Sequence, residues 1–254
     1  MSRLNRIKAE QLAEAEKTGV NPYDMEQFLG VDSATGKHAV HASVSKSLDD
    51  YQMALEIDIA KIAAVPDITD KVRIKATVLP TYLDFVNDYV KSGVNYPNTV
   101  AVQVMIWLLD TLQIEAGLNL ALHLIKQRQR MPTKFDRDIP TFVCDFFYDW
   151  ASLLLKENLS ASPYLDVLIA TAENEQWDLH PLIFSKLWVM LAKHKERNGE
   201  FETALQLCFK AEQINPEKAG VKGMKERLQA QLQKPAPHAG SESQAADALN
   251  TPNE

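Results

Sequence analysis

Apolar residues recur at helical spacing throughout residues 47–232. The pattern predicts a series of helices over residues 47–65, 69–91, 99–112, 115–128, 141–157, 164–175, 181–197, 200–213 and 217–232. Ser47, with Asp50 in the first turn, is expected to cap the first helix, and Pro80 is expected to kink the second. Because the spacing stays helical, the predicted fold is all-α, with no sheet beyond an incidental pair of strands.

The two ends of the chain differ in composition from this region. Residues 1–17 mix apolar and charged positions and predict a short surface helix, whereas residues 18–46 are rich in Gly, Pro and small polar residues and predict a linker. The last residues are rich in Ala, Ser, Pro, Gln and Asn, which is typical of disorder. The predicted organisation is a flexible N-terminal arm and linker over 1–46, a helical domain over 47–232 and a disordered tail over 233–254.

The stretch 188–216 has the spacing of a tetratricopeptide repeat, in which two antiparallel helices are joined by a tight turn. The matching positions are Trp188, Leu191, Ala192, Gly199, Phe201, Ala204, Cys208, Ala211 and Pro216. A weaker copy covers 101–131, with Met105, Ile114, Gly117, Ala121 and Leu124 in the corresponding places. Two degenerate copies are too few for a long solenoid. The prediction is therefore a core of helical hairpins with tetratricopeptide-like packing, and a peptide-binding groove is the alternative.

Composition limits the class of protein and its compartment. The 254 residues carry a net charge of −7, so any contact with nucleic acid must come from local patches or from several subunits together. The two cysteines have no neighbouring Cys or His at zinc-ligand spacing, which argues against a disulfide framework or a structural zinc. No apolar run approaches the ~20 residues that span a bilayer. We therefore expect no membrane partner and a location in the cytoplasm.

Two local clusters of cations stand out against this acidic background. Residues 126–137 hold a single acid, Asp136, against five basic residues, which are Lys126, Arg128, Arg130, Lys134 and Arg137. The first eight residues hold no acid and the three cations Arg3, Arg6 and Lys8. Such cations can bind DNA phosphates and release counterions. Alternatively, the first cluster complements the dipole of a helix C-terminus and the second begins a solvated helix.

Catalytic motifs are absent from the sequence. There is no GxxxxGK[ST], GxSxG or HExxH, so neither a P-loop ATP site nor a familiar hydrolase centre is predicted. Asp145 and Asp149 share a helical face and could hold Mg²⁺ for phosphodiester cleavage. Two-metal nuclease chemistry needs three or four convergent carboxylates, and this pair is interpreted instead as an exposed helix face. The histidines are scattered, and no metal site is predicted.

The middle of the chain contains two distinctive runs, VMIWLLDTLQIEAGLNLA over residues 104–121 and RMPTK over residues 130–134. These runs resemble the small terminase subunits of Peduovirus-type tailed phages, in which an MLWRLD helix leads into an AGALEIA helix and then an MPGK loop. The matching positions are Trp107, Leu109, Asp110, Ala116, Gly117, Ala121, Met131, Pro132 and Lys134. Residues 219–228, AGVKGMKERL, are also similar to the family's AGVKKEIERLE. The resemblance covers about residues 47–232.

This resemblance implies a role in packaging viral DNA. Subunits of this kind recognise the cohesive-end site and present it to the large subunit, which carries the packaging ATPase, and the family is described as a probable endonuclease component that directs cohesive-end cleavage. The implied partners are double-stranded viral DNA and the large subunit, in the host cytoplasm. We also expect a homo-oligomer, because several copies presenting modest basic patches gain affinity together. No cofactor is expected in this chain, although a nuclease would require Mg²⁺.

Two other classes of function remain as alternatives. One is a helical-repeat scaffold that binds only protein partners, and the other is a nuclease in its own right. The resemblance also has a departure at the C-terminus, because family members end in a long Lys/Arg-rich tail. Here residues 241–254, SESQAADALNTPNE, are acidic. The expected DNA contact therefore moves to residues 3–8 and 126–137.

Overall fold

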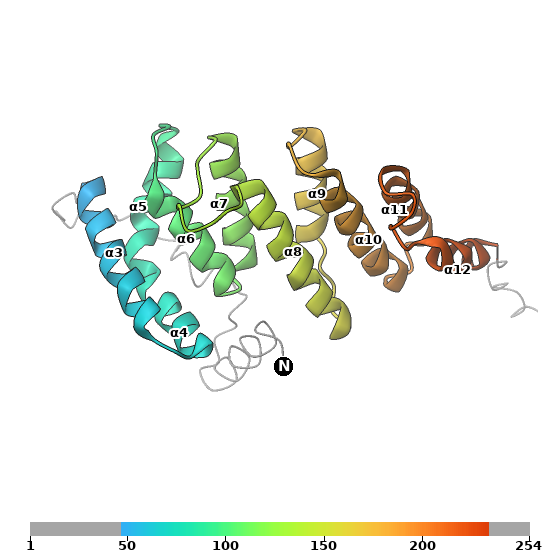
Figure 1. The fold of residues 1–254 in the computed structure, drawn as a ribbon, viewed down its shortest axis with the longest axis horizontal. Helices are drawn as coiled ribbons and strands as arrows, with labels where there is room; N and C mark the ends of the chain where they lie inside the picture. Colours follow the sequence, from blue (N-terminus) through green and yellow to red (C-terminus); the bar gives the residue numbers. More distant parts are fainter. Residues whose placement is uncertain (1–46, 234–254) are drawn as a thin grey trace, which may run out of the picture.

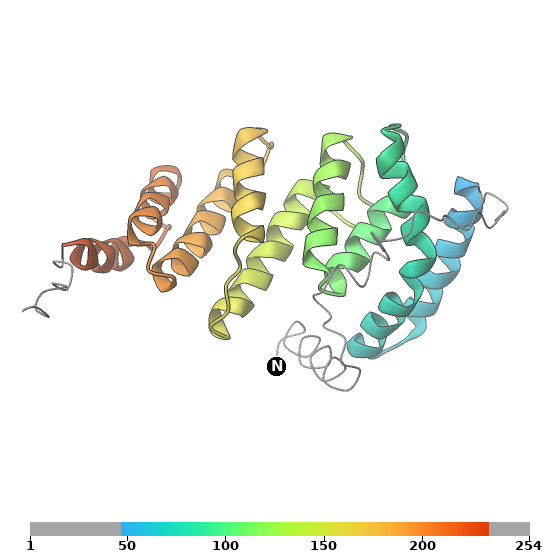
Figure 2. The same cartoon turned by 180° about the vertical axis from the view of Figure 1, so that it is seen from behind.

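The computed structural model describes residues 47–233, and every regular element in this range is an α-helix. The helices are α3 (Leu48–Ala64), α4 (Ile68–Val78), α5 (Pro80–Ser92), α6 (Thr99–Asp110), α7 (Ile114–Lys126), α8 (Ile139–Lys156), α9 (Tyr164–Asn174), α10 (Pro181–Arg197), α11 (Phe201–Ile214) and α12 (Lys222–Leu232). They form an elongated row from α3 at one end to α12 at the other (Figure 1), and the view from behind shows the same order (Figure 2). The predicted all-α fold is confirmed for the described residues. The predictions for residues 1–46 and for the tail after residue 233 lie outside them.

The start of α3 follows from its first residues. The Ser47 hydroxyl accepts the Asp50 N–H at 3.3 Å, and the Asp50 carboxylate accepts the Ser47 N–H at 2.9 Å. This capping box satisfies two N–H groups that the helix leaves without partners. The predicted cap is confirmed.

Two predicted helix boundaries are wrong. Residues 69–91 form two helices rather than one kinked helix, because the ring of Pro80 prevents α4 from continuing while the missing N–H costs nothing at the first position of α5. The last helix begins at Lys222 rather than at residue 217. Gly220 adopts a left-handed φ of 68°, which ends any helical run before it.

The core is organised around α6. Residues Val100–Leu109 are all buried, and α6 contacts α3, α4, α5 and α7. A helix that is buried on every side needs neighbours all around it, and the surrounding helices supply them. Lys75 of α4 is also buried, and its Nζ lies 2.5 Å from the carboxylate of Asp110 at the end of α6. This ion pair joins α4 to the C-terminal end of α6.

The predicted repeat at 188–216 is a hairpin made of α10 and α11. Its predicted packing positions Trp188, Leu191, Ala192, Ala204, Cys208 and Ala211 are all buried. The buried Ser185 hydroxyl donates to the Ala211 carbonyl oxygen at 3.2 Å, so the two helix backbones lie close together. The weaker copy forms the α6–α7 hairpin, in which Met105, Ala121 and Leu124 are buried. Both hairpins confirm the predicted packing.

His194 of α10 is buried within this packing. Its Nε2 lies 3.0 Å from the Ala151 carbonyl oxygen of α8. Burial lowers the pKa of His194 below 6.5, and the hydrogen bond to Ala151 offsets only part of this effect. Protonation is therefore easier in the unfolded chain than in the folded one.

We expect acid to destabilise the domain through this histidine. The unfolded state binds the proton more tightly, so the stabilisation is complete above about pH 6.5 and is lost as the pH falls toward the lowered folded pKa. Urea unfolding at pH 7.5 and at pH 5.5 measures the effect, and the midpoint should be lower at pH 5.5. In His194→Gln the difference between the two pH values should be smaller. Equal midpoints for the unaltered chain would contradict the expectation.

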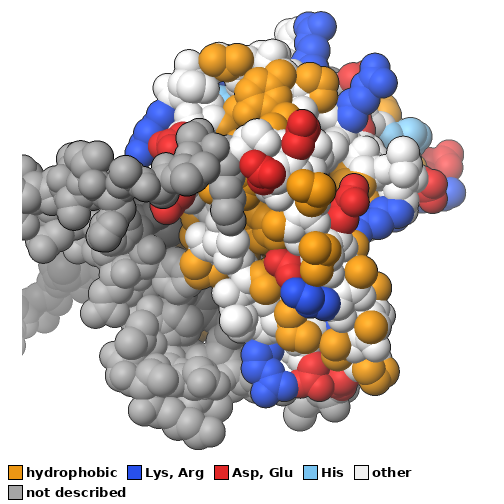
Figure 3. Space-filling model, turned by 90° about the vertical axis from the view of Figure 1, so that its left-hand side faces the viewer, with side chains coloured by type: hydrophobic (Ala, Val, Ile, Leu, Met, Phe, Trp, Pro, Cys, Tyr) orange, Lys and Arg blue, Asp and Glu red, His pale blue; other side chains and the backbone are white. Residues whose placement is uncertain are grey.

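The two ends of the row present different surfaces. The α3 end faces the viewer in Figure 3, where hydrophobic side chains lie open among charged ones. On the outer face of α3, Met53 is 58% exposed and Ile57 is 57% exposed. By contrast, α12 exposes charged residues such as Glu226 and Arg227. No helix in residues 47–233 is both long enough and apolar enough to cross a membrane.

Candidate nucleic-acid interface

The predicted basic cluster begins where α7 ends, and the backbone there forms a defined cap. Arg128 adopts a left-handed φ of 56°. Its N–H donates to the Ile125 carbonyl oxygen at 2.9 Å, and the Gln129 N–H donates to the Leu124 carbonyl oxygen at 3.0 Å. This is a Schellman cap with arginine at the position that glycine usually occupies. The cap stops the helix and fixes the direction in which the following loop leaves it.

Two glutamines attach this loop to the loop between α5 and α6. Gln127 Nε2 donates to the Val94 carbonyl oxygen at 3.1 Å. Gln129 Nε2 donates to the Tyr96 carbonyl oxygen at 2.8 Å, while its Oε1 accepts the Asn98 N–H at 2.9 Å. We call Gln127, Gln129 and these contacts the glutamine bridge. The bridge joins two loops at one edge of the row, where α5 and α7 both end (Figure 1).

The cations of the cluster alternate with these glutamines along the chain. All five predicted cations of the loop are exposed, namely Lys126, Arg128, Arg130, Lys134 and Arg137. Within the described residues, Arg137 forms an ion pair with Asp145 and the other four form none. Lys134 lies over the Phe135 ring, with Nζ 5.4 Å from the ring centroid. The structure therefore leaves four positive charges of this loop available to a ligand.

The structure adds Lys91, a cation that sequence reasoning missed. Lys91 is exposed in the last turn of α5. It lies three residues before Val94, whose carbonyl oxygen accepts from Gln127, so it belongs to the segment that the glutamine bridge joins to the end of α7. We call the exposed cations of these two joined segments the basic edge, which consists of Lys91, Lys126, Arg128, Arg130, Lys134 and Arg137. Sequence spacing alone could not reveal Lys91, since it lies 35 positions before Lys126.

The nearby histidine adds no charge to this edge. Burial lowers the pKa of His123, and the neighbouring cation Lys126 lowers it further. His123 is therefore neutral at pH 7, and the positive potential comes from Lys and Arg alone.

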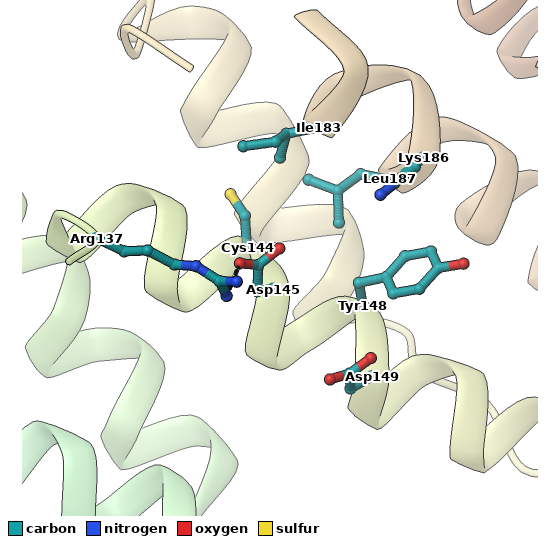
Figure 4. Close-up of a pocket in the computed structure, with 8 residues that line it drawn as sticks. All are labelled: Arg137, Cys144, Asp145, Tyr148, Asp149, Ile183, Lys186 and Leu187. Carbon is teal, nitrogen blue, oxygen red and sulfur yellow. Dashed lines mark hydrogen bonds and ion pairs between the residues drawn. The ribbon is translucent and has the colours of Figure 1, made fainter. Parts of the chain in front are cut away.

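A cavity of about 250 Å³ lies between α8 and α10, at the far end of the basic loop (Figure 4). Its lining residues are Arg137, Cys144, Asp145, Tyr148, Asp149, Ile183, Lys186 and Leu187. Burial raises the pKa of the Cys144 thiol to about 12, so the thiol stays protonated and is a poor nucleophile. Asp149 is exposed, as the sequence interpretation of a helix face expects, whereas Asp145 is partly exposed and is turned toward Arg137. The lining thus contains two acidic residues, Asp145 and Asp149, and two basic residues, Arg137 and Lys186.

No group of three or more His, Cys, Asp and Glu side chains in residues 47–233 is placed to hold a metal ion. The carboxylate of Asp145 is engaged by Arg137. The Asp145 and Asp149 pair therefore lacks the arrangement of carboxylates that two-metal nuclease chemistry needs. The second predicted cluster, Arg3, Arg6 and Lys8, lies outside the described residues.

Comparison with known proteins identifies the family. The family model described as the phage small terminase subunit matches residues 52–181. The chain belongs to this family. The resemblance seen in the sequence motifs is therefore confirmed, and this small terminase subunit belongs to the machinery that packages phage DNA.

Two curated relatives of the chain are both named as endonuclease subunits of a terminase. The "Probable terminase, endonuclease subunit" of Haemophilus phage HP1 (strain HP1c1) is 29% identical over 226 residues, which cover 82% of this chain and 79% of the relative. The "Terminase, endonuclease subunit" of Escherichia phage P2 is 28% identical over 166 residues, which cover 64% of this chain and 65% of the relative. No solved structure matches the chain.

Most of the family-like motif residues have structural roles in this small terminase subunit. Trp107 is buried in the core, Gly117 lies against Leu109, and Asp110 pairs with Lys75. The RMPTK run differs, because it lies in the loop that carries the basic edge. The matched region, residues 52–181, thus includes the α6–α7 hairpin and most of the candidate DNA-binding cations.

Proposed function

We propose that this small terminase subunit binds double-stranded viral DNA at the cohesive-end site through its basic edge and directs cleavage and packaging of that DNA with the large subunit. The observation that carries the proposal is the set of exposed cations at this edge in a chain of net charge −7. Four cations of the loop have no acidic partner among the described residues. Such charges gain free energy from phosphate contacts, because each contact releases counterions from the duplex.

Binding to phosphates supplies affinity and orientation rather than sequence recognition. Contacts to base edges or a dependence on DNA shape are needed to select the cohesive-end site. The basic edge therefore serves to hold the duplex in register, and recognition of the site requires further contacts in the assembled complex. The large subunit supplies ATP hydrolysis, since this chain has no P-loop.

We further propose that several copies of the chain act together. A single basic edge offers few cations, and linking copies raises the effective concentration of the second contact. The outer face of α3, with Met53 and Ile57 exposed, is a surface that a second copy can cover. Stacks of helical hairpins usually end in polar faces, whereas the end at α3 exposes Met53 and Ile57 among its charged residues. Sedimentation of the full chain at high micromolar concentration tests this, and a strict monomer would contradict it.

A cleavage assay separates the proposed function from its alternatives. A duplex with the cohesive-end site is incubated with Mg²⁺ and ATP, with this chain alone, with the large subunit alone, or with both. We expect this chain alone to bind the duplex without cutting it, and both subunits together to cut it at the site. No binding at low salt would favour a scaffold that contacts only proteins. Cutting by this chain with Mg²⁺ alone would favour a nuclease in its own right.

A further inference from the structure

We propose that Gln127 and Gln129 are positioning residues for DNA binding, which hold the cations of the basic edge toward solvent before DNA arrives. The inference rests on the proposed function of that edge. Neither glutamine carries charge, and neither is placed to contact a phosphate while its amide is engaged by the α5–α6 loop. Their effect on DNA must therefore pass through Lys126, Arg128 and Arg130, which alternate with them in the chain.

The glutamine bridge uses nearly all the hydrogen-bonding capacity of the Gln129 amide. In addition to its bonds to Tyr96 and Asn98, Nε2 lies 3.2 Å from the Asn95 Oδ1 and 3.1 Å from the Tyr89 hydroxyl. Its Oε1 accepts the N–H of Asn98, a residue that is only 1% exposed. This amide therefore connects the basic loop to a buried residue at the start of α6.

Tyr89 of α5 links the two glutamines. Its side chain is 3% exposed, and its hydroxyl donates to Gln127 Oε1 while it accepts from Gln129 Nε2. From the α5–α6 loop, Asn95 Nδ2 donates to the backbone carbonyl oxygen of Gln127 at 3.2 Å. The backbone of residues 127–129 is thus fixed from both sides. With two glutamines turned inward and the helix capped at Arg128, the cations between and beside them point outward.

This arrangement matters because disordered cations bind less well than ordered ones. Each flexible side chain that must be ordered on binding weakens affinity by roughly twofold to twelvefold. A loop that already holds two arginines in place avoids much of that loss. The left-handed backbone at Arg128 needs such support, since it is an unfavourable conformation for any residue with a Cβ atom.

The test is Gln129→Ala in the full chain, which changes no charge. We expect affinity for duplex DNA, measured by fluorescence anisotropy, to fall by about tenfold through loss of this ordering. Hydrogen exchange of the Asn98 amide should speed up, because its acceptor is gone. Gln113→Ala is the matched control, since Gln113 Nε2 also makes a side-chain hydrogen bond, to Thr111 Oγ1 at 3.1 Å, but at the opposite end of α7. The control should leave DNA affinity unchanged.

A double-mutant cycle shows whether the glutamine acts through the arginines. In the Arg128→Ala/Arg130→Ala background, Gln129→Ala should cause a much smaller further loss of affinity, because only Lys126 is left for it to position. A merely structural effect would instead lower affinity by the same factor in both backgrounds.

Two results would overturn the inference, and they differ in what they leave standing. If Gln129→Ala binds DNA normally while the arginine variant binds weakly, the basic edge functions without positioning by glutamine. If the arginine variant itself binds normally, both the inference and the proposed role of the basic edge fail.

Discussion

Replacing both Arg128 and Arg130 with Ala should weaken binding to specific and random duplexes alike and make it less sensitive to salt. Each phosphate contact adds about 0.9 to the slope of log affinity against log salt concentration, so the slope should flatten by up to about two. Sequence preference should persist, because phosphate contacts position the protein without reading bases. Folding should survive, since both side chains are exposed and alanine meets the left-handed backbone at 128 with the same steric cost as arginine. Anisotropy titrations at several salt concentrations measure both effects.

The matched control is Lys193→Ala with Lys218→Ala. This variant removes the same two charges from exposed positions on α10 and before α12. It should change the slope little. If the two double variants behave alike, only net charge matters. If Arg128→Ala/Arg130→Ala binds DNA with unchanged affinity and slope, these cations only stabilise the C-terminal end of α7 through its helix dipole. Arg3, Arg6 and Lys8 then become the next candidates for DNA binding.

Gly117→Ala should destabilise the domain, although alanine is normally the better residue in a helix. A Cβ atom at 117 would lie 2.6 Å from the Cδ2 atom and 3.4 Å from the backbone nitrogen of Leu109. Leu109 is fully buried, so it has nowhere to move without disturbing the α6–α7 hairpin. Overpacking of this kind costs about 1–3 kcal/mol, which exceeds the helix-propensity gain of about 1 kcal/mol. Thermal unfolding should show a midpoint lower by several degrees.

Gly223→Ala provides the opposite case in the same chain. Gly223 is exposed in α12, and a Cβ atom there would meet nothing closer than the Arg227 side chain at 3.9 Å. This substitution should leave stability unchanged or raise it by up to about 1 kcal/mol. If Gly117→Ala stabilised the protein as Gly223→Ala does, the two helices could not be packed as closely as the structure shows.

The helices could be predicted from sequence because their determinants are local. Apolar spacing places most of them, Ser47 and Asp50 cap the first, and small residues such as Ala204 and Gly117 mark the hairpins. The errors arose at Pro80 and Gly220. The ring of Pro80 and the left-handed backbone at Gly220 each interrupt a helix, although the apolar residues around them keep helical spacing.

The basic edge could be predicted only in part. The cluster at 126–137 is visible as a local reversal of charge, but the glutamine bridge joins positions that are 31 to 40 residues apart. The segment that follows Lys91 meets the loop through these tertiary contacts, and Arg137 pairs with Asp145 on α8. Such pairings depend on how α5, α7 and α8 pack, which no local pattern records.

Hydrogen exchange of the full chain with and without a duplex carrying the cohesive-end site tests the central claim most directly. At low salt we expect DNA to protect amides of the loop between α7 and α8 and of the adjoining α5–α6 loop, and we expect this protection to fade as salt is raised. The exposed face of α12 should exchange equally in both samples. Unchanged exchange around residues 126–138 with DNA bound, or protection confined to other parts of the chain, would contradict the assignment of the basic edge as the DNA-binding surface.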